Sequence, residues 1–154
     1  MTGAPAQPRL YVVPPAGATG AARILGTVRR ATRAYDGYDE ATPATAAFNV
    51  GVAYGTWGVR DDRLDVLTGI GYHLTAHAQR VTAAHRYIVT AAYTEDAATV
   101  SVLALRGRAA ADPALLDPAQ HPELQAVTDG PRGLRGWTHL AAGPCLYAGI
   151  RHDP

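Results

Sequence analysis

The sequence predicts an all-β fold, a small antiparallel β-barrel of about eight strands with one long loop. Three observations lead to this prediction. Apolar side chains occupy alternate positions of several short segments, which is typical of strands with one buried face. Turn residues recur at hairpin spacing, and no segment is a convincing long helix. A closed sheet also leaves no exposed edge strand and can hold one ligand inside.

The composition indicates one folded domain and excludes several classes of protein. With 154 residues, 47% of them hydrophobic, the chain can bury a core. No apolar run reaches the roughly 18 residues of a membrane span, and the N-terminus lacks the features of a secretory signal. A net charge of +1 creates no strong field for nucleic acid or an anionic membrane. We therefore expect a cytoplasmic protein with no nucleic-acid and no membrane partner.

Two further features of the composition bear on the argument. Cys145 is the single cysteine, which excludes an internal disulfide and a cysteine-based zinc site, and its apolar neighbours predict an inert core thiol. All 14 basic residues are arginine and alanine is abundant, as GC-rich coding produces. Alanine is then weak evidence for helix, so the hydrophobic pattern receives more weight than propensity.

The chain is expected to comprise a flexible tail over residues 1–8 and a single barrel domain over residues 9–154. The first strand candidate is "RLYVV", which two prolines end. The segment "RILGTVRRATRAY" combines β-branched residues with regularly placed arginines, as in a strand with one wet face. The stretch "DGYDEATPAT" after it is predicted to be a loop.

The clearest alternation lies in "AFNVGVAYG" and in the segment that follows it. The first predicts a strand whose apolar face consists of Phe48, Val50, Val52 and Tyr54. Beyond the polar turn "GVRDDR", a second strand is predicted from residues that again share one parity, namely Leu64, Val66, Ile70, Tyr72 and Leu74.

Residues 73–85 allow two interpretations. They can form a helix with Leu74, Ala78 and Val81 on one stripe, or two strands that meet near Gln79 and Arg80. We favour strands, because the threonines and the "RYIVTAAY" run suit a pleated surface.

The rest of the chain is predicted from turn residues and short apolar runs. "YTEDAATVSVLAL" supplies a turn and a strand, and residues 107–123 form a long loop with one helical turn at "PALLD". The last strands are "GLRGWTHLA" and "CLYAGIR", with a turn at Gly143 and Pro144. The glycines and proline of "VTDGPRGLRGW" predict a sharp bend that leads into the first of these two strands.

Two segments resemble a known family. "AVTDGPRGLRGWTHL" is similar to a late-strand signature of the allene oxide cyclase and dirigent proteins, and also to a glycine run of the small actinobacterial spirotetronate cyclases, matched here by Gly130, Gly133, Leu134 and Gly136. "RILGTVRRATRAYD" resembles the first barrel strand of these cyclases. Together the two segments cover roughly a fifth of the chain. The resemblance implies an antiparallel barrel, oligomerisation through its outer face, and ring closure in polyketide biosynthesis, including Diels–Alder reactions.

The sequence departs from the cyclase pattern at one aromatic position. Leu140 stands where the cyclases have a tryptophan, and Trp137 stands where they have another aromatic. The active-site tryptophan of the family therefore has no counterpart here, which leaves the substrate open.

In the barrel interpretation, four tyrosines line one cavity. Tyrosine offers an apolar wall and one hydroxyl, which suits a hydrocarbon ligand with a few carbonyls. We expect Tyr72 and Tyr87 to be catalytic. The expected substrate-binding residues are Tyr54, Tyr93, Trp137 and Phe48. Alternatively, the tyrosines are core aromatics whose hydroxyls lie at the barrel rim.

His73 and His77 form a pair whose meaning depends on the local structure. Four residues apart on a helix, they could bind one metal ion, although the glutamate expected after the first histidine of a metalloprotease motif is replaced by Leu74. On a strand they would lie roughly 13 Å apart, too far for one ion. Because a strand is favoured, we expect no metal site and interpret both as surface or subunit-contact histidines.

The leading functional hypothesis is a cofactor-free cyclase that closes a ring in a hydrophobic, polyketide-derived chain. Orientation of the reactive ends in an apolar cavity can lower a barrier by roughly 7–11 kcal/mol. We expect no cofactor, a small hydrophobic substrate, and a homo-oligomer, either a dimer or a trimer. The alternative is a non-catalytic barrel, with an open or filled interior, that binds or carries an apolar metabolite. A metal-dependent enzyme is a third class.

Overall fold

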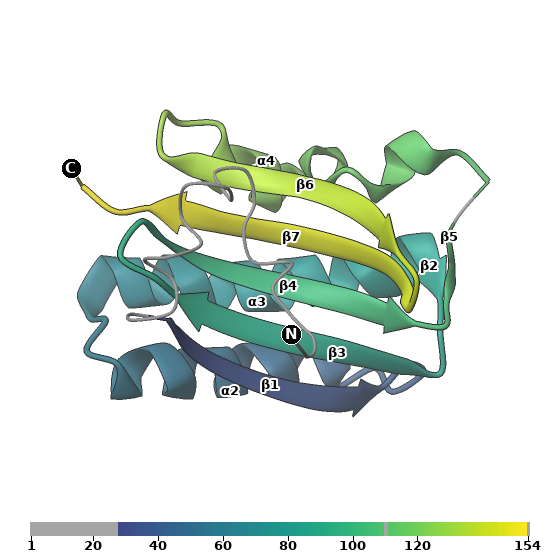
Figure 1. The fold of residues 1–154 in the computed structure, drawn as a ribbon, viewed down its shortest axis with the longest axis horizontal. Helices are drawn as coiled ribbons and strands as arrows, with labels where there is room; N and C mark the ends of the chain where they lie inside the picture. Colours follow the sequence, from purple (N-terminus) through teal and green to yellow (C-terminus); the bar gives the residue numbers. More distant parts are fainter. Residues whose placement is uncertain (1–27, 110, 154) are drawn as a thin grey trace.

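A five-stranded antiparallel sheet carries two long helices on one face in the computed structural model, which describes residues 28–109 and 111–153 (Figure 1). Across the sheet the strands follow the order β1 (Arg29–Asp36), β3 (Arg86–Tyr93), β4 (Ala97–Leu105), β7 (Gly143–Arg151) and β6 (Gly133–Leu140). Every neighbouring pair is antiparallel. The antiparallel sheet and the strands at its centre confirm that part of the prediction.

The remaining elements of the described chain are helices and one short strand pair. The helices are α2 (Thr42–Thr56), α3 (Asp61–Val81), η2 (Pro113–Leu116), η3 (Pro118–Gln120) and α4 (Pro122–Thr128). Strands β2 (Thr82–Ala83) and β5 (Arg108–Ala109) pair with each other beside the main sheet. The tail over residues 1–8 and the "RLYVV" strand lie outside the described residues.

The all-β prediction is wrong between residues 42 and 81, where two helices replace the two predicted strands. In α2, Ala46, Val50 and Tyr54 are buried at a spacing of four, which is one face of a helix. Phe48 and Val52, expected on the same face as Val50 and Tyr54, are 69% and 52% exposed. Their alternation was a coincidence in a helix whose buried residues include two alanines, Ala46 and Ala47.

The ends of α2 carry ordinary helix signals. Pro43 lies in the first turn, where its fixed φ suits a helix and its missing N–H costs nothing. Gly58 follows the last turn with a φ of 93°, and the N–H groups of Gly58 and Val59 donate to Gly55 and Tyr54 carbonyls. This is the Schellman arrangement, which ends a helix at a residue in the left-handed region.

Helix α3 packs closely against α2. A Cβ atom on Gly71 would lie 3.2 Å from Cβ of Val50, so the absence of a side chain there lets the two helices approach. The adjoining face of α3 enters the core through residues that are at most 1% exposed, namely Leu67, Ile70, Leu74 and Ala78. Residues 73–81 are therefore helical, and the interpretation that favoured strands there is wrong.

The core lies between the helices and the face of the sheet that they cover (Figure 1). Val89, Val102 and Leu146 are paired across three adjacent strands, and each is at most 3% exposed. Burial of a side chain of this size contributes roughly 1.5–3 kcal/mol. The sheet has two ends, β1 and β6, so it is open and no barrel forms among the described residues.

The segment between β5 and β6, residues 112–129, is folded onto the molecule. Asp112 and Asp117 accept hydrogen bonds at the starts of η2 and η3, and Leu116 and Leu124 are fully buried. Arg135 of β6 donates to Thr128 and Asp129 at the end of the segment. The predicted helical turn at "PALLD" is confirmed, and the segment packs against α3 and the sheet edge.

Among the described residues, no helix is both long enough and apolar enough to cross a membrane.

Candidate metal centre

The tyrosines predicted to line one cavity occupy separate places in the fold. Tyr54 is fully buried between α2 and the sheet. Its hydroxyl donates to the carbonyl oxygen of Thr99 at a distance of 2.6 Å, and the carbonyl oxygen of Ala92 lies 3.0 Å from the same hydroxyl. Burial raises the pKa of this hydroxyl well above its ordinary value. Tyr54 therefore joins the helix to two strands and is not available to a substrate.

Tyr87, predicted to be catalytic, is also a structural side chain. It is 1% exposed, and its hydroxyl lies 2.8 Å from Oγ1 of Thr82 at the end of α3. Burial raises the pKa of Tyr87. Tyr72, the other predicted catalytic residue, lies on the outer surface of α3 with 43% of its area exposed.

The remaining predicted substrate-binding residues also fail to converge. Phe48 is exposed on α2, Trp137 is exposed on the edge strand β6, and Tyr93 packs on the ring of His152 with centroids 4.7 Å apart. A hollow between β1, β3 and α2 has a volume of about 30 Å³, room for a water molecule or two but not for a polyketide chain. The expected common pocket is therefore not formed by these residues.

Cys145 is buried, and burial raises its thiol pKa to about 12. The predicted burial of this thiol is confirmed, and the raised pKa disfavours the thiolate, which is the reactive form.

The structure instead gathers histidines from two parts of the chain. Because α3 is a helix, His73 and His77 lie on one side of it, and the 112–129 segment brings His121 against them. Nε2 of His121 lies 3.0 Å from Nδ1 of His73. The ring of His121 also meets the ring of His77, with centroids 5.7 Å apart.

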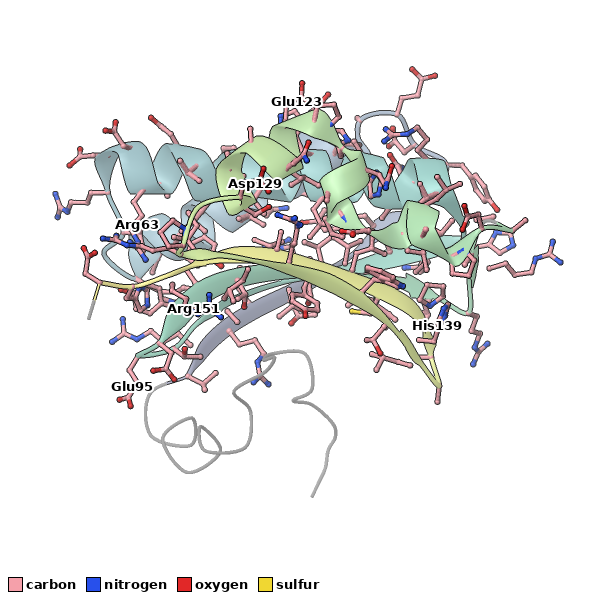
Figure 2. The ribbon with its side chains drawn as sticks, turned by 90° about the horizontal axis from the view of Figure 1, so that it is seen from above. Arg63, Glu95, Glu123, Asp129, His139 and Arg151 are labelled. Carbon is pink, nitrogen blue, oxygen red and sulfur yellow. The ribbon has the colours of Figure 1, made fainter. Side chains whose placement is uncertain are left out.

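Glu123 completes a set of three potential metal ligands. Its Oε1 lies 3.1 Å from Nε2 of His121, and one ligand atom each from His73, His121 and Glu123 lie within 4.8 Å of one another. His121 is buried, His73 is half-buried and Glu123 is exposed. Figure 2 shows Glu123 at the outer side of the 112–129 segment, away from the sheet.

Arg80 and His77 support the cluster from the last turns of α3. Arg80 donates to Nδ1 of His77 at 2.9 Å, which leaves Nε2–H of His77 to donate to the carbonyl oxygen of Leu115 at 3.0 Å. The same guanidinium is 3.4 Å from Nδ1 of His121. These contacts fasten the 112–129 segment to α3 and hold His121 in place.

The surroundings keep the buried histidines neutral. Burial, with help from the charge of Arg80 and the neighbouring ring of His121, lowers the pKa of His77 from 6.5 to about 4. Burial also lowers the pKa of His121, and His73 and Arg80 add to the effect, while Glu123 opposes it. A neutral imidazole is the form that binds a metal ion.

The sequence prediction did not include His121 or Glu123. It placed His73 and His77 at the surface or at a subunit contact because it treated this segment as a strand, whereas the segment is a helix. One signal was present: Pro122 between His121 and Glu123 is typical of the first turn of a helix, which places both residues at a helix start. No pattern in the sequence connects that helix start to His73, 48 residues earlier.

A scan against protein-family models and a search of the curated proteins both found no match to this chain. The resemblance to the spirotetronate cyclases, the ring-closing activity and the carrier alternative therefore stay predictions.

Proposed function

We propose that this protein binds a divalent transition-metal ion, with Zn²⁺ the best fit, through one ring nitrogen each of His73 and His121 and a carboxylate oxygen of Glu123. The observation that supports this proposal is the convergence of the three ligand atoms within 4.8 Å, from two elements far apart in the sequence. Imidazole and carboxylate are the nitrogen and oxygen ligands that Zn²⁺ takes in proteins.

The spacing of the ligand atoms suits a tetrahedral ion. Zinc–nitrogen bonds of about 2.0–2.1 Å place two ligands of a tetrahedron about 3.3 Å apart. The separations of 3.0 Å between His73 and His121 and 3.1 Å between His121 and Glu123 are close to this value. Small rotations of the side chains would bring all three ligands to bonding distance.

The hydrogen bonding of the cluster without a metal ion is incomplete. Arg80 donates to Nδ1 of His121, so the single proton of that ring sits on Nε2. This one N–H faces both Nδ1 of His73 and the carboxylate of Glu123, and it cannot donate well to both. A metal ion in place of this proton would bind Nε2 of His121, Nδ1 of His73 and the carboxylate of Glu123 at once.

Arg80 acts against metal binding in this arrangement. A metal-bound His121 carries its proton on Nδ1, and that N–H would face the guanidinium of Arg80, another donor. Because Arg80 is exposed, its side chain can turn into solvent when the ion binds. The guanidinium charge would still weaken affinity for a cation.

The proposed site has an open coordination position. Three protein ligands with water as the fourth are typical of catalytic zinc, whereas structural zinc has four protein ligands. Glu123 is the exposed member, with 58% of its side chain accessible, so the fourth position would face solvent. The proposal therefore favours the metal-dependent class, in which the ion exchanges a bound water for another small ligand.

The experiment is calorimetric titration of Zn²⁺ into tag-free protein that has been dialysed against a chelator. We expect one ion per chain, and at least about tenfold weaker binding in His73→Gln and in Glu123→Gln. Glu123→Gln alters an exposed side chain and removes its charge, so the fold is expected to be retained.

The matched control is His139→Gln, which removes an exposed histidine on β6, on the sheet side of the molecule and well apart from Glu123 (Figure 2). It should leave the affinity unchanged. Equal affinity in wild type, His73→Gln and Glu123→Gln would overturn the proposal, as would the absence of saturable binding by the wild type.

A further inference from the structure

The outer surface of the helical layer exposes three large apolar side chains. Phe48 and Val52 of α2 are 69% and 52% exposed, and Tyr72 of α3 is 43% exposed. Exposed apolar side chains that adjoin one another on a folded surface are typical of binding interfaces. Phe48 and Val52 lie on α2, apart from the metal centre, whereas the ring of Tyr72 contacts the ring of His73 with centroids 5.2 Å apart.

The packing of the two helices places the three side chains on one surface. Phe48 and Val52 are one helical turn apart and face away from the sheet. The helices touch where Gly51 approaches Oγ1 of Thr68, and Tyr72 lies one turn beyond Thr68 on α3. We call the surface formed by Phe48, Val52, Tyr72 and the small residues between them the α2/α3 face.

Charge is absent from the middle of the α2/α3 face. Helix α2 has no charged residue, and neither has α3 between Val66 and Gln79. The charges of α3 lie at its ends, with Asp61, Asp62, Arg63 and Asp65 near the start and Arg80 in the last turn. Asp62 and Asp65 are exposed. A start with a net negative charge and a basic end make the face complementary to itself in the reverse direction.

We propose that the α2/α3 face binds a second copy of this chain, in a two-fold arrangement with the two α3 helices antiparallel. Asp62 and Arg80 lie at equal distances along the chain from Gly71, so a two-fold axis level with Gly71 would bring each Asp62 near Arg80 of the second copy, provided that the guanidinium turns away from His77. Such an isologous contact requires a self-complementary patch. The neutral apolar centre meets its own copy without repulsion between like charges.

The dimensions of the face are sufficient for a dimer. Helix α3 has 21 residues and is therefore about 31 Å long. Helix α2 has 15 residues and is about 22 Å long, so the two helices, each about 10 Å wide, present a footprint of about 500 Å² per copy, near the lower range of specific interfaces. The expected dimer is reversible, with Phe48, Val52 and Tyr72 at its centre.

Sedimentation equilibrium of the full chain tests this proposal. We expect a monomer–dimer equilibrium in wild type and at least a tenfold larger dissociation constant in Phe48→Asp. The control is Val127→Asp, which introduces the same charge at a residue of α4 with 40% exposure, away from the α2/α3 face, and should leave the constant unchanged. Asp62→Arg should weaken the dimer in a salt-dependent way. Unchanged association in Asp62→Arg would overturn the antiparallel arrangement.

A photo-crosslinking amino acid in place of Phe48, followed by mass spectrometry, identifies the occupant. Crosslinks to α2 or α3 of a second copy support the proposal. A wild-type monomer at all concentrations would overturn it, and so would crosslinks within one copy to residues 1–27 or, in cell extract, to a different protein alone. A dimer that is insensitive to Phe48→Asp would also overturn it.

Discussion

Replacement of Leu116 by alanine tests how firmly the 112–129 segment is attached to the body of the molecule. Leu116 is fully buried, and the adjacent Leu115 carbonyl accepts a hydrogen bond from His77. Removal of a buried leucine side chain beyond Cβ costs about 2–5 kcal/mol. The total stability of such a domain is about 5–15 kcal/mol, so the loss is a large share of it.

The control is provided by the neighbouring residue. Leu115 is 41% exposed, and Leu115→Ala should change the free energy of unfolding by less than about 1 kcal/mol. Urea denaturation followed by circular dichroism measures both variants, and hydrogen exchange of residues 113–128 shows whether the segment opens locally in Leu116→Ala. Equal unfolding free energies for Leu116→Ala and Leu115→Ala would show that Leu116 does not hold the 112–129 segment in place.

Three further predictions concern individual side chains. Tyr54→Phe removes the donor to two buried carbonyl oxygens and should lower the unfolding free energy by about 1–3 kcal/mol in urea titrations; a neutral effect would contradict the assigned role. His77 has a folded-state pKa of about 4, below its ordinary 6.5, so the unfolded chain binds more protons in that window and stability is lost as pH falls through it. The stability difference between wild type and His77→Gln should therefore shift in favour of the variant from pH 6.5 to pH 4, and a constant difference would oppose this. Arg80→Met should tighten Zn²⁺ binding up to about tenfold in calorimetry; weaker binding would show that Arg80 supports the ion.

Where the sequence prediction succeeded, strands were marked by β-branched residues and hairpin turns. "RYIVTAAY" and "TVSVLAL" form β3 and most of β4, and the bend of "VTDGPRGLRGW" leads into β6, as expected. These strands have few competing interpretations, because their valines and threonines suit a pleated surface. The segment "PALLD" likewise contains the proline that starts a helical turn.

The sequence prediction failed in α2 and α3, where alanine and glycine carry the helix signals. Ala46 and Ala78 are fully buried, and with alanine discounted as coding bias the period of α2 and α3 could not be recognised. Pro43 and Gly58 mark the two ends of α2, a pairing that argues for helix whatever the composition. Had these signals been weighed, α2 would have been predictable.

The metal centre could be predicted only in part. Once α3 is recognised as a helix, the spacing of His73 and His77 places both on one face. The approach of His121 depends on burial of Leu116 and Leu124 and on the hydrogen bond from His77 to Leu115. Those are tertiary contacts between segments separated by about 40 residues, and no local pattern encodes them.

The proposed function requires that the fold brings His73, His121 and Glu123 together as ligands of a single ion. Anomalous diffraction from a crystal soaked in Zn²⁺ locates the ion. We expect one strong anomalous peak within bonding distance of all three side chains. Strong peaks confined to other residues, such as the exposed His85 or His139, would contradict the proposed function.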